Sequence, residues 1–585
     1  LLYCLLCWSR IKSDGIHELI LVSRLFFLSC HQMIYSICIY TQKGFTMMKF
    51  DQIEQPNSSA FLVDFHAQKK ELLTYFHYLP NKASYENRAL SLKSHQVNRE
   101  QLTAVVREYM TKFPKNDAVN LHLAELEKDA LVVIGGQQAG LLTGPLYSVH
   151  KALSIILLAK QQRQALGIPV VPVFWIAGED HDLDEINSTF TPNLGRLQKH
   201  TYNDRPNRKQ MASETAVEAE KLQSFIRDVF KQFTETIYTK ELLQKCLNMT
   251  LHVSSYSHFF AVMMNDFFSN EGLLLIDAAY KPLREYESAY FVKMIEHSKE
   301  IATLVVEQER DFQLAGYGQP IQASEDSANL FVVENGERFL LRYNNGEFFN
   351  EAAGLRFSKQ QLLDIAINQP ERLSNNVVTR PLMQEMVFPV LAFIGGPGEL
   401  AYWAAFKTMF EHFDMELPVM VPRLSITMVD KKSDQYLNEL DLQVESVFNG
   451  ELQSRKQDFI NDIKDDDAEE MILEIQQTLI EQYQKLENHL SNAGPTLNLV
   501  TKKNLELHNK QFIYLSRKIE DTNLLRHDVT MRKYNHIEGT LFPEYTLQER
   551  WFSPLLFLNE VGPTLIDDLL SQSFEFNGKH IILTF

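Results

Sequence analysis

The sequence predicts an α/β fold, with a parallel sheet, helical and β insertions, and a C-terminal antiparallel coiled coil. Short apolar runs typical of buried strands alternate with helical stretches over residues 131–425, which favours parallel strands joined by helical crossovers. Further along, two long segments repeat apolar residues every seven positions on either side of a Gly-Pro step, which favours a helical hairpin.

Length and composition limit the class of protein. At 585 residues the chain exceeds the roughly 250–300 residues at which one core stops growing, so we expect several domains. A hydrophobic fraction of 45% and a charged fraction of 23% are typical of a soluble globular protein. The net charge of −18 disfavours nucleic acid and anionic membrane surfaces as partners, because both attract Lys and Arg.

Cysteines are concentrated at the start of the chain. Four of the 5 lie in the first 46 residues, and Cys246 is the one that lies beyond them. The body of the protein is therefore no disulfide framework, and we expect a reducing, cytoplasmic location. We expect Cys246 to be a core residue, because no local pattern activates its thiol.

The first 47 residues differ from the rest. They begin without Met and are rich in Leu, Ile, Cys and Tyr, yet they contain neither an apolar run of about 18 residues nor a signal-peptide pattern. We interpret residues 1–47 as a non-native extension, with the start at Met47 or Met48. A genuine N-terminal anchor is the alternative.

A strand–helix–strand unit follows. Residues 131–134 predict a buried strand, and the Gly-rich stretch "GGQQAGLLTGPLYSVHK" comes directly after it. We expect a helix with Thr143 as its N-cap, Pro145 in its first turn and Gly167 at its C-terminal cap. The strand "VVPVFWIAGEDHD" comes next. Because such a crossover makes the two strands parallel, their two polar loops should open on the same edge of the sheet, where α/β sheets bind ligands.

The same pattern returns later in the chain. Three more segments predict strands of the sheet: residues 272–280, which contain Asp277, residues 387–403, which continue into a Gly-rich turn and a helix, and residues 417–425.

Two insertions interrupt this pattern, at about residues 189–270 and 300–370. The first is mostly helical and polar. In the second, Asn335-Gly336 and Asn345-Gly346 stand between apolar runs and predict β-hairpins.

From about residue 431 the pattern becomes helical. The apolar repeat comprises Ile472, Leu479 and Leu486 in one segment, with Ile475 between them, and Leu505, Phe512 and Ile519 in the other, with Leu515 between them. Gly494-Pro495 separates the two segments. We therefore expect a core over residues 48–430, a coiled-coil arm over 431–527 and a segment over 528–585 that packs back on the core. The arm either forms a homodimer or folds back on the core.

The Gly-rich stretch is the first candidate binding site. Its glycine spacing does not match a dinucleotide fingerprint, and no Lys-Ser/Thr follows its last glycine as in a Walker loop. Glycine backbone beside a helix N-terminus still suits an anion. We expect the substrate to contact Gly136, Gln137, Gln138, Thr143 and Gly144, and a purely structural turn is the alternative.

The acidic stretch "AGEDHDLDEIN" is the sharpest chemical cluster. We expect Asp180, His181 and Asp182 to be catalytic, through acid–base chemistry or by holding an ammonium group, with Glu179 binding substrate. Consecutive residues rarely ligate one ion together, so no metal site is expected. A solvated acidic loop is the alternative. His150 is a further catalytic candidate, with a half-buried structural histidine as its alternative.

Other polar residues near strand ends are substrate-binding candidates, although each alone is more often structural. Arg380 and Arg423 would suit a carboxylate. We expect the substrate to contact residues near this edge of the sheet: Asp277, Asn376, Arg380, Gly396, Gly398, Glu399 and Tyr402.

Together with "FWIAGEDHDLDEIN", "FIGGPGELAYW" and "LQERWFSPLLFLNEVG", the Gly-rich stretch resembles the bacillithiol biosynthesis cysteine-adding enzyme family, the BshC-type cysteine ligases. The resemblance covers residues 48–585. It implies a Rossmann-like core with connecting-peptide insertions, as in class I aminoacyl-tRNA synthetases, and a C-terminal coiled coil. It also implies a ligase that forms a carbon–nitrogen amide bond between cysteine and the amine of glucosaminyl-malate, in the last step of bacillithiol synthesis.

This resemblance assigns partners to the candidate residues. The ammonium group of cysteine would suit Asp180 or Asp182, and malate would suit Arg380 and helix N-termini. An acyl-adenylate would activate the carboxylate, so ATP with Mg²⁺ is the expected cofactor. The chain has no His-x-Gly-His step and no Lys-Met-Ser-Lys-Ser loop, since Asp430-Lys431-Lys432-Ser433 matches poorly. The alternatives are a nucleotidyltransferase-like enzyme on a sugar and a non-catalytic, nucleotide-binding coiled-coil dimer.

Overall fold

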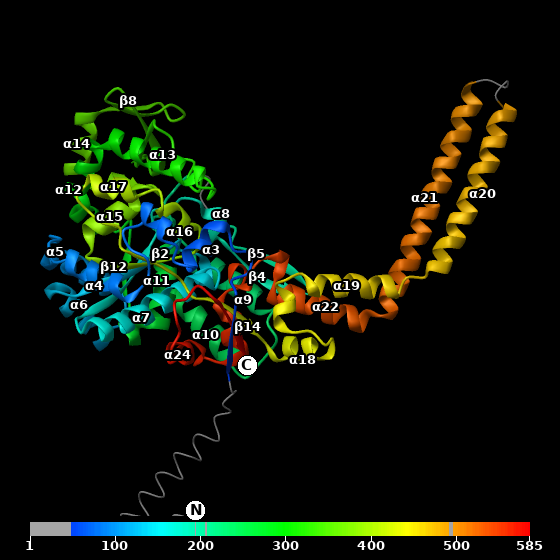
Figure 1. Ribbon diagram of the computed structural model, residues 1–585, viewed down its shortest axis with the longest axis horizontal. Coiled ribbons are helices and arrows are strands. Elements are labelled where there is room, and N and C mark those ends of the chain that lie inside the picture. The colour runs from blue at the N-terminus through cyan, green and yellow to red at the C-terminus, as the bar shows by residue number, and fades with distance from the viewer. Residues whose placement is uncertain (1–47, 194, 205–207, 491–494) are drawn as a thin grey trace, which may run out of the picture. The chain divides into compact units, whose positions relative to one another are not determined.

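Five parallel strands form the central sheet of the computed structural model, which describes residues 48–193, 195–204, 208–490 and 495–585 (Figure 1). The interpretation of residues 1–47 lies outside these described residues. The strand order is β13 (Val419–Pro422), β12 (Val390–Gly395), β2 (Leu131–Gln137), β3 (Val170–Ile176), β6 (Leu274–Asp277). All four neighbouring pairs are parallel, as the crossover pattern predicted. The strands are almost entirely buried, which is typical of a sheet covered on both faces.

The order of the strands creates a switch point in the topology. From β2 the chain adds β3 and then β6 on one side, and it later adds β12 and then β13 on the other. The direction of winding therefore changes between β2 and β12. Open α/β sheets bind ligands outside the carboxyl ends of the strands at such a point.

Strand β2 is longer than predicted, because Gly135 and Gly136 belong to it and not to a loop. A Cβ on Gly135 would lie 2.9 Å from the Ile394 carbonyl oxygen, and one on Gly136 would lie 2.6 Å from the Trp175 carbonyl oxygen. These glycines allow β12 and β3 to approach β2 closely. They serve the packing of the sheet, and the prediction that the loop starts at residue 135 is wrong.

The crossover helix α7 (Tyr147–Leu166) begins later than predicted. Thr143 is not its N-cap, because Thr143 lies in a 3-10 turn with φ 68° and its hydroxyl donates to the Leu142 carbonyl at 2.6 Å. The predicted left-handed cap at Gly167 is confirmed, with φ 67°. Helix α7 is apolar on most sides because it packs on β2 and β3 and also contacts C-terminal elements.

Ten helices of the described core pack on this sheet, on one another or, in the case of α17, on α13 of the second insertion. They are α3 (Ala60–His66), α4 (Lys82–Ser91), α5 (Arg99–Met110), α6 (Asp117–Lys128), α7, α11 (Tyr256–Phe268), α12 (Lys281–Glu296), α15 (Thr379–Val387), α16 (Pro397–Trp403) and α17 (Lys407–His412).

The first insertion contains more strand than expected. It starts with α8 (Leu183–Ile186) and the antiparallel ribbon β4 (Ser188–Asn193) and β5 (Arg196–Thr201), before α9 (Ala219–Phe230) and α10 (Thr239–Met249). Cys246 lies in α10, is buried and has the pKa of its thiol raised to about 12 by burial, which confirms it as an inert core residue.

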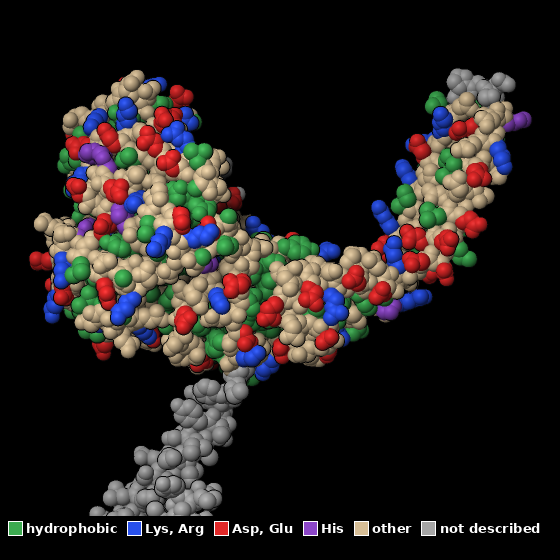
Figure 2. All heavy atoms as spheres, viewed as in Figure 1, with side chains coloured by type: hydrophobic (Ala, Val, Ile, Leu, Met, Phe, Trp, Pro, Cys, Tyr) green, Lys and Arg blue, Asp and Glu red, His purple; other side chains and the backbone are tan. Residues whose placement is uncertain are grey.

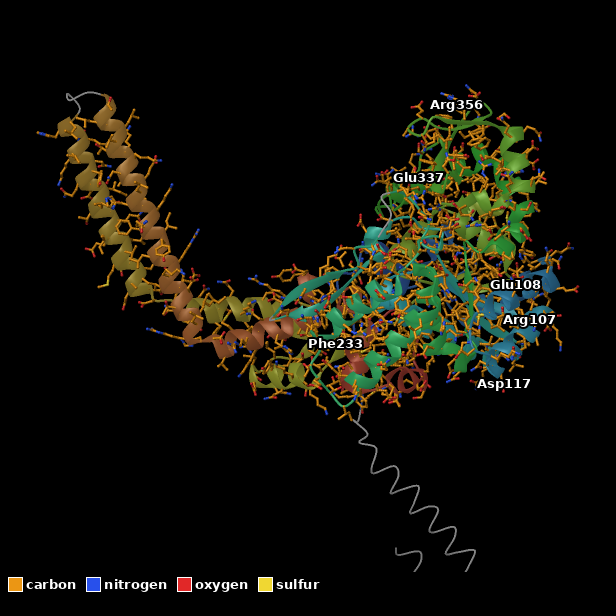
Figure 3. The ribbon with its side chains drawn as sticks, turned by 180° about the vertical axis from the view of Figure 1, so that it is seen from behind. Arg107, Glu108, Asp117, Phe233, Glu337 and Arg356 are labelled. Atoms are coloured by element: carbon orange, nitrogen blue, oxygen red, sulfur yellow. The ribbon has the colours of Figure 1, made fainter. Side chains whose placement is uncertain are left out.

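The second insertion is an antiparallel sheet with helices beside it. Its strand order is β10 (Leu355–Ser358), β9 (Glu347–Asn350), β8 (Glu337–Asn344), β7 (Ser327–Glu334), β11 (Leu373–Asn375). Helix α13 (Ser298–Leu314) precedes the sheet in sequence, and α14 (Lys359–Asn368) lies between β10 and β11. Both Asn-Gly hairpins are confirmed, since Asn335, Gly336, Asn345 and Gly346 all have positive φ. Figure 3 labels Glu337 and Arg356 on β8 and β10.

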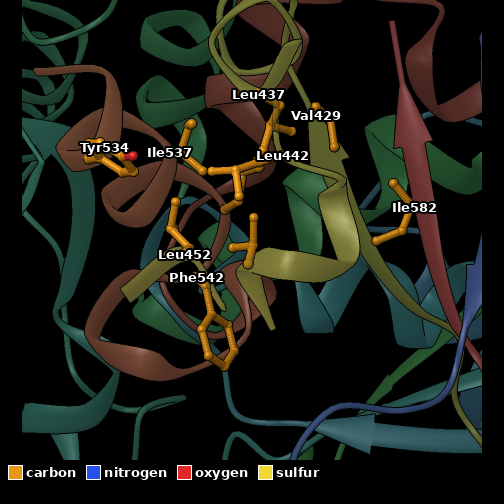
Figure 4. Packing of buried hydrophobic residues seen from close by; sticks show 10 residues of the cluster. Val429, Leu437, Leu442, Leu452, Tyr534, Ile537, Phe542 and Ile582 are labelled. Atoms are coloured by element: carbon orange, nitrogen blue, oxygen red, sulfur yellow. The ribbon is translucent and has the colours of Figure 1, made fainter. Parts of the chain in front are cut away.

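The C-terminal elements build a second core. Strands β1 (Lys49–Ile53), β15 (His580–Thr584) and β14 (Ser425–Val429) form a three-stranded sheet in that order. Apolar residues of β14, β15, α18 (Lys431–Glu439), α19 (Glu451–Asp462) and α22 (Asp528–Leu541) pack together, among them Val429, Leu437, Ile537 and Ile582 (Figure 4). The short helices α23 (Pro554–Val561) and α24 (Leu565–Leu570) complete this part.

Helices α20 (Asp466–Leu490) and α21 (Pro495–Arg526) form the predicted hairpin (Figure 1). Of the predicted repeat, Ile472 is buried and Leu479, Leu505, Phe512 and Ile519 are half-buried, whereas three members, Ile475, Leu486 and Leu515, are 57%, 44% and 47% exposed. Acidic side chains gather where α20 begins (Figure 2). In the described part of the chain, no helix has the length and apolar character needed to cross a membrane.

Candidate active site

Every strand of the parallel sheet leads into a polar side chain at its carboxyl end. In sheet order these are Arg423 after β13, Glu399 after β12, Gln137 on β2, Asp180 after β3 and Asp277 on β6. Because the strands are parallel, all five lie along one edge of the sheet. The switch point between β2 and β12 lies in the middle of this row.

Lys151 is the central cation of this edge. Its side chain is only 1% exposed, and its ammonium donates to the Gly136 carbonyl at 2.7 Å and to Gln137 Oε1 at 3.1 Å. It also forms an ion pair with Glu399, which in turn accepts the Gly396 N–H at 2.8 Å. Burial lowers the pKa of Lys151, and the Glu399 carboxylate opposes that shift.

The start of α16, where the sequence predicted an anion site, is occupied by the carboxylate of Glu399. The Gly396 N–H is already bonded to Glu399, so it is not open to a ligand. Gly398 is exposed and has no neighbour within 4 Å of its Cβ position. The positive end of this short helix therefore stabilises Glu399 itself.

Arg380 and Tyr402 form the second part of the cluster. Arg380 Nη2 donates to Tyr402 Oη at 2.6 Å, and no carboxylate pairs with this guanidinium among the described residues. Burial raises the pKa of Tyr402 to about 12, although Arg380 lowers it, so the phenol is neutral. Arg380 is half-buried, and its charge is open to an anionic ligand.

Glu549 joins the C-terminal segment to the edge. Its carboxylate pairs with Arg423 through two bonds of 2.7 and 2.8 Å, accepts from Ser425 Oγ at 2.9 Å, and lies 2.8 Å from His150 Nδ1. Although burial raises it, the Arg423 charge holds the pKa of Glu549 well below its usual range. Burial lowers the pKa of His150, so this histidine is neutral and donates through Nδ1–H.

His150 is thus directed away from the acidic loop. It is 0% exposed, and its Nε2 has no hydrogen-bond partner in the described residues. The structure does not bring it together with the other three catalytic candidates: His150 contacts Glu549, whereas Asp180 contacts Gln138. The residue beside it in sequence, Lys151, is the one that faces the strand ends.

The charges at the switch point do not cancel. Lys151, Arg380 and Arg423 supply three cations, and Glu399 and Glu549 supply two carboxylates. The excess positive charge is carried by Arg380. This part of the edge is suited to the carboxylate of a ligand.

The acidic loop lies beside the cationic cluster. Gln138 Nε2 donates to Asp180 Oδ2 at 2.7 Å and to Glu185 Oε2 at 2.8 Å, which confirms that the two polar loops share one edge. Asp180 is half-buried, and Asp182 is exposed. Their negative charge is available to an ammonium group.

His181 faces the second insertion. Its Nδ1 lies 3.2 Å from Arg338 Nη1, and because Arg only donates, Nδ1 accepts and the proton of the neutral ring is on Nε2. Burial and the charge of Arg338 lower the pKa of His181, which keeps the ring neutral. His181 and Asp182 line a cavity of about 870 Å³ together with Arg338, Arg208 and Lys209. The neutral ring can offer an Nε2–H donor to a ligand there.

Glu179 holds the acidic loop in place through contacts within the protein. It is buried, forms an ion pair with Arg284 and accepts the Asn375 N–H at 3.3 Å. Arg284 also pairs with Glu287 at 2.8 Å. Burial raises the pKa of Glu287 to about 8, although Arg284 lowers it. Glu179 Oε2 is therefore bonded within the protein.

Asp277 and Asn376 are also bonded to protein partners. Asp277 accepts from the hydroxyls of Ser213 and Ser257 and from the Ala279 N–H. Asn376 accepts the N–H groups of Val378 and Thr379 where α15 begins. Both residues hold loops in place next to the predicted site.

Thr143 and Gly144 lie in a buried turn that the C-terminal segment covers. Thr143 is 0% exposed, and Ser553 Oγ donates to the carbonyl of the neighbouring Leu142 at 2.9 Å. Gly144 has φ 67°. The predicted contact of Thr143 and Gly144 with substrate is not supported by their burial.

Three charged residues of the edge, Arg284, Arg338 and Glu549, were not singled out from the sequence, although Glu549 lies in the stretch "LQERWFSPLLFLNEVG" that carries the family resemblance. Glu549 and His150 are 399 positions apart, so no spacing rule connects them. Arg338 follows a hairpin turn and would be taken for an exposed strand residue. In the described residues, no group of three or more His, Cys, Asp or Glu side chains could hold a metal ion.

Two family models match this chain, one over its core and one over its C-terminal part. A family model described as "Bacillithiol biosynthesis BshC, N-terminal Rossmann-like domain" matches residues 48–424, and one described as "Bacillithiol biosynthesis BshC, C-terminal coiled-coil domain" matches residues 426–585.

Two bacterial relatives carry the name "Putative cysteine ligase BshC". The protein of Lysinibacillus sphaericus (strain C3-41) is 46% identical over 536 residues, which is 92% of this chain and 100% of that protein. The protein of Bacillus cereus (strain ATCC 10987 / NRS 248) is 34% identical over 537 residues, with the same two coverages of 92% and 100%. A solved Campylobacter jejuni structure described as a "putative arginyl t-RNA synthetase" matches over 82% of this chain and 99% of that chain at 8% identity, but its TM-score of 0.17 does not establish a shared fold.

Proposed function

This chain belongs to the bacillithiol biosynthesis BshC family, and we propose that it is a ligase that joins L-cysteine to the amine of glucosaminyl-malate, the last step of bacillithiol synthesis. The names of its relatives support a cysteine ligase. The observation that carries the substrate assignment is the pairing of a cationic cluster with an acidic loop on one sheet edge. Both proposed substrates carry charged groups of both signs at neutral pH.

We assign the negatively charged malyl group of glucosaminyl-malate to the cationic cluster. Arg380 has no carboxylate partner among the described residues, so it is the group we assign to a malyl carboxylate. Tyr402 orients the guanidinium through its hydroxyl. Lys151 is already bonded to Glu399 and Gln137 and sets the local positive potential.

The ammonium of cysteine is matched to the acidic loop. Asp180 and Asp182 supply carboxylates, and the Nε2–H of His181 supplies a neutral donor for an oxygen. In the reaction a carbon–nitrogen bond forms and a carbon–oxygen bond of the activated cysteine carboxylate breaks. The departing oxygen leaves with the activating group, as AMP if the carboxylate is adenylated, and the attacking amine loses a proton. We assign this proton to the carboxylates of Asp180 and Asp182.

ATP and Mg²⁺ enter this proposal as co-substrates to be tested. Neither the Gly-rich stretch after β2 nor the Gly-rich turn after β12 forms a phosphate loop, because Gly135 and Gly136 lie in β2 and the Gly396 N–H is bonded to Glu399. We therefore assign no residue and no step to the nucleotide.

The proposal is tested by incubating the purified protein with glucosaminyl-malate and cysteine, with and without ATP and Mg²⁺, and analysing the products by mass spectrometry. We expect the cysteinyl amide of the aminosugar, together with AMP if an adenylate forms. Product without AMP would keep the ligase and reject adenylation. Absence of product in every arm, including one supplemented with cell extract, would overturn the ligase.

A further inference from the structure

A second polar cavity lies at the opposite edge of the parallel sheet. It has a volume of about 390 Å³ and is lined by residues from α4, α12, α15 and the segment before β13. Arg88 at its wall donates through Nε to the carbonyl of Val390, the first residue of β12, at 3.0 Å. The cavity therefore opens at the amino ends of the strands, whereas the candidate active site lies at their carboxyl ends.

A buried ion pair forms part of the wall of this cavity. Arg88 and Glu385 are each 2% exposed and are bonded to each other. The other carboxylate oxygen of Glu385, Oε2, has no hydrogen-bond partner in the described residues. Burial raises the pKa of Glu385 to about 7, although Arg88 lowers it. A buried acceptor without a donor is rare in folded proteins and requires an explanation.

His95 contributes a second acceptor of this kind. It forms a hydrogen bond with the backbone of Glu385, and burial with the charge of Arg88 lowers its pKa to about 4. The ring is therefore neutral at pH 7. Its Nε2 has no partner in the part of the chain that the structure describes, so Nδ1 makes the backbone bond and Nε2 carries the lone pair.

The net charge of the lining favours a cation. Glu416 accepts from the hydroxyls of Tyr78 and Ser91, both at 2.6 Å. Although burial raises it, these hydrogen bonds lower the pKa of Glu416, so it is ionised. With Asp414 and Glu385, the cavity has three carboxylates, and Arg88 and Lys293 are its two cations.

The remaining lining residues suit a hydroxylated ligand. Ser94 and Gln96 can donate to and accept from hydroxyl groups, and Tyr290 and Phe413 offer apolar ring faces. We propose that this cavity is an accessory binding site for a small polyhydroxylated amine, with the ammonium directed at Glu385 Oε2 and His95 Nε2. Helix α15 carries Glu385 of this cavity and Arg380 of the candidate active site.

The proposal is tested by isothermal titration calorimetry of the full chain with D-glucosamine as the probe and D-glucose as the probe without an amine. We expect D-glucosamine to bind the wild-type protein saturably. In Glu385→Gln and in Asp414→Asn, one binding equivalent should be lost, or its affinity should fall about tenfold or more. Asn tolerates the positive φ of 56° at position 414, so this second variant folds even if Glu385→Gln does not. Glu325→Gln, an exposed carboxylate outside the lining, is the matched control and keeps wild-type binding.

The measured quantity is the difference between variants in the number of D-glucosamine molecules bound per chain. It therefore does not depend on whether the candidate active site, at the opposite edge of the sheet, also binds an aminosugar. The proposal is overturned if D-glucosamine does not bind, if D-glucose binds as tightly, or if the folded Asp414→Asn protein keeps every equivalent at wild-type affinity. A failed ligase assay would leave all of these results unaffected.

Discussion

At the scale of single residues, a few buried charges organise the sheet edge. Lys151 links β2 to α16 through Glu399, and Glu549 links the C-terminal segment to Arg423 and His150. Arg380 differs from them, because no carboxylate neutralises it among the described residues. Its functional role is therefore the easiest to separate from a structural one.

Replacing Arg380 tests the assignment of the malyl carboxylate. Arg380→Gln removes a charge-assisted hydrogen bond, so we expect the KM for glucosaminyl-malate to rise about 10- to 100-fold, with a smaller change in the KM for cysteine. Tyr402→Phe should have a weaker effect in the same direction. Arg356→Gln, on the exposed strand β10, is the control and should leave both values unchanged. Equal rises in both KM values would argue against the assignment.

Glu549 should make the fold sensitive to acid. Its folded pKa lies below the unfolded value of about 4.3, so its stabilising contribution is present above that pH and is lost as the pH falls toward the lowered pKa. Glu549→Gln leaves Arg423 buried and unpaired, and we expect the free energy of unfolding at about pH 7 to fall by about 3–5 kcal/mol. Urea unfolding at about pH 7 and about pH 4 measures both effects. A Glu549→Gln protein as stable as Glu325→Gln would contradict this role.

At the scale of elements, the strand–helix–strand pattern was predictable, because the spacing of apolar residues and the length of each apolar run are local properties of the sequence. The parallel order placed the Gly-rich and acidic loops on one edge, and Gln138 bonded to Asp180 confirms it. The end of β2 was not predictable. Glycine favours turns, which placed Gly136 in a loop, but here a glycine is required because the carbonyl of Trp175 on the neighbouring strand leaves no room for a side chain. The contact of His150 with Glu549 is also non-local, so the sequence could not separate His150 from the acidic loop.

Gly136 should tolerate no side chain. Gly136→Ala would place a Cβ 2.6 Å from the Trp175 carbonyl oxygen in the middle of the sheet, and we expect it to destabilise the protein by about 1–3 kcal/mol. Gly398→Ala has nothing within 4 Å of its Cβ and should be close to neutral. Thermal unfolding of both variants measures the difference. Equal melting temperatures would contradict the packing role of Gly136.

At the scale of the whole molecule, the helical hairpin carries exposed apolar side chains near both of its ends. Met471, Leu473, Leu499 and Val500 are 64%, 59%, 68% and 59% exposed. These side chains are available to a second copy of the chain, so the expected homodimer through the coiled coil remains our proposal. Residues Phe50–Thr584 form one compact unit, in which the C-terminal segment supplies Glu549 to the candidate site.

The dimer is tested by light scattering during size-exclusion chromatography. We expect twice the monomer mass for the wild-type protein at micromolar concentration and the monomer mass for a Met471→Lys, Leu499→Lys double variant. Thermal unfolding should show that the core of the variant stays folded. A monomeric wild-type protein would remove the dimer and leave the hairpin free or folded back on the core.

The central claim, ligation of cysteine at the edge between the cationic cluster and the acidic loop, is tested most directly by product formation in matched variants. Cysteine and glucosaminyl-malate are supplied with ATP and Mg²⁺, and mass spectrometry quantifies the cysteinyl product made by the wild-type protein, Asp180→Asn with Asp182→Asn, and Glu325→Gln. We expect product from the wild-type and Glu325→Gln proteins and a loss of about 100-fold or more in the acidic-loop variant. Equal product from all three would contradict the site, and no product from any of them would contradict the ligase.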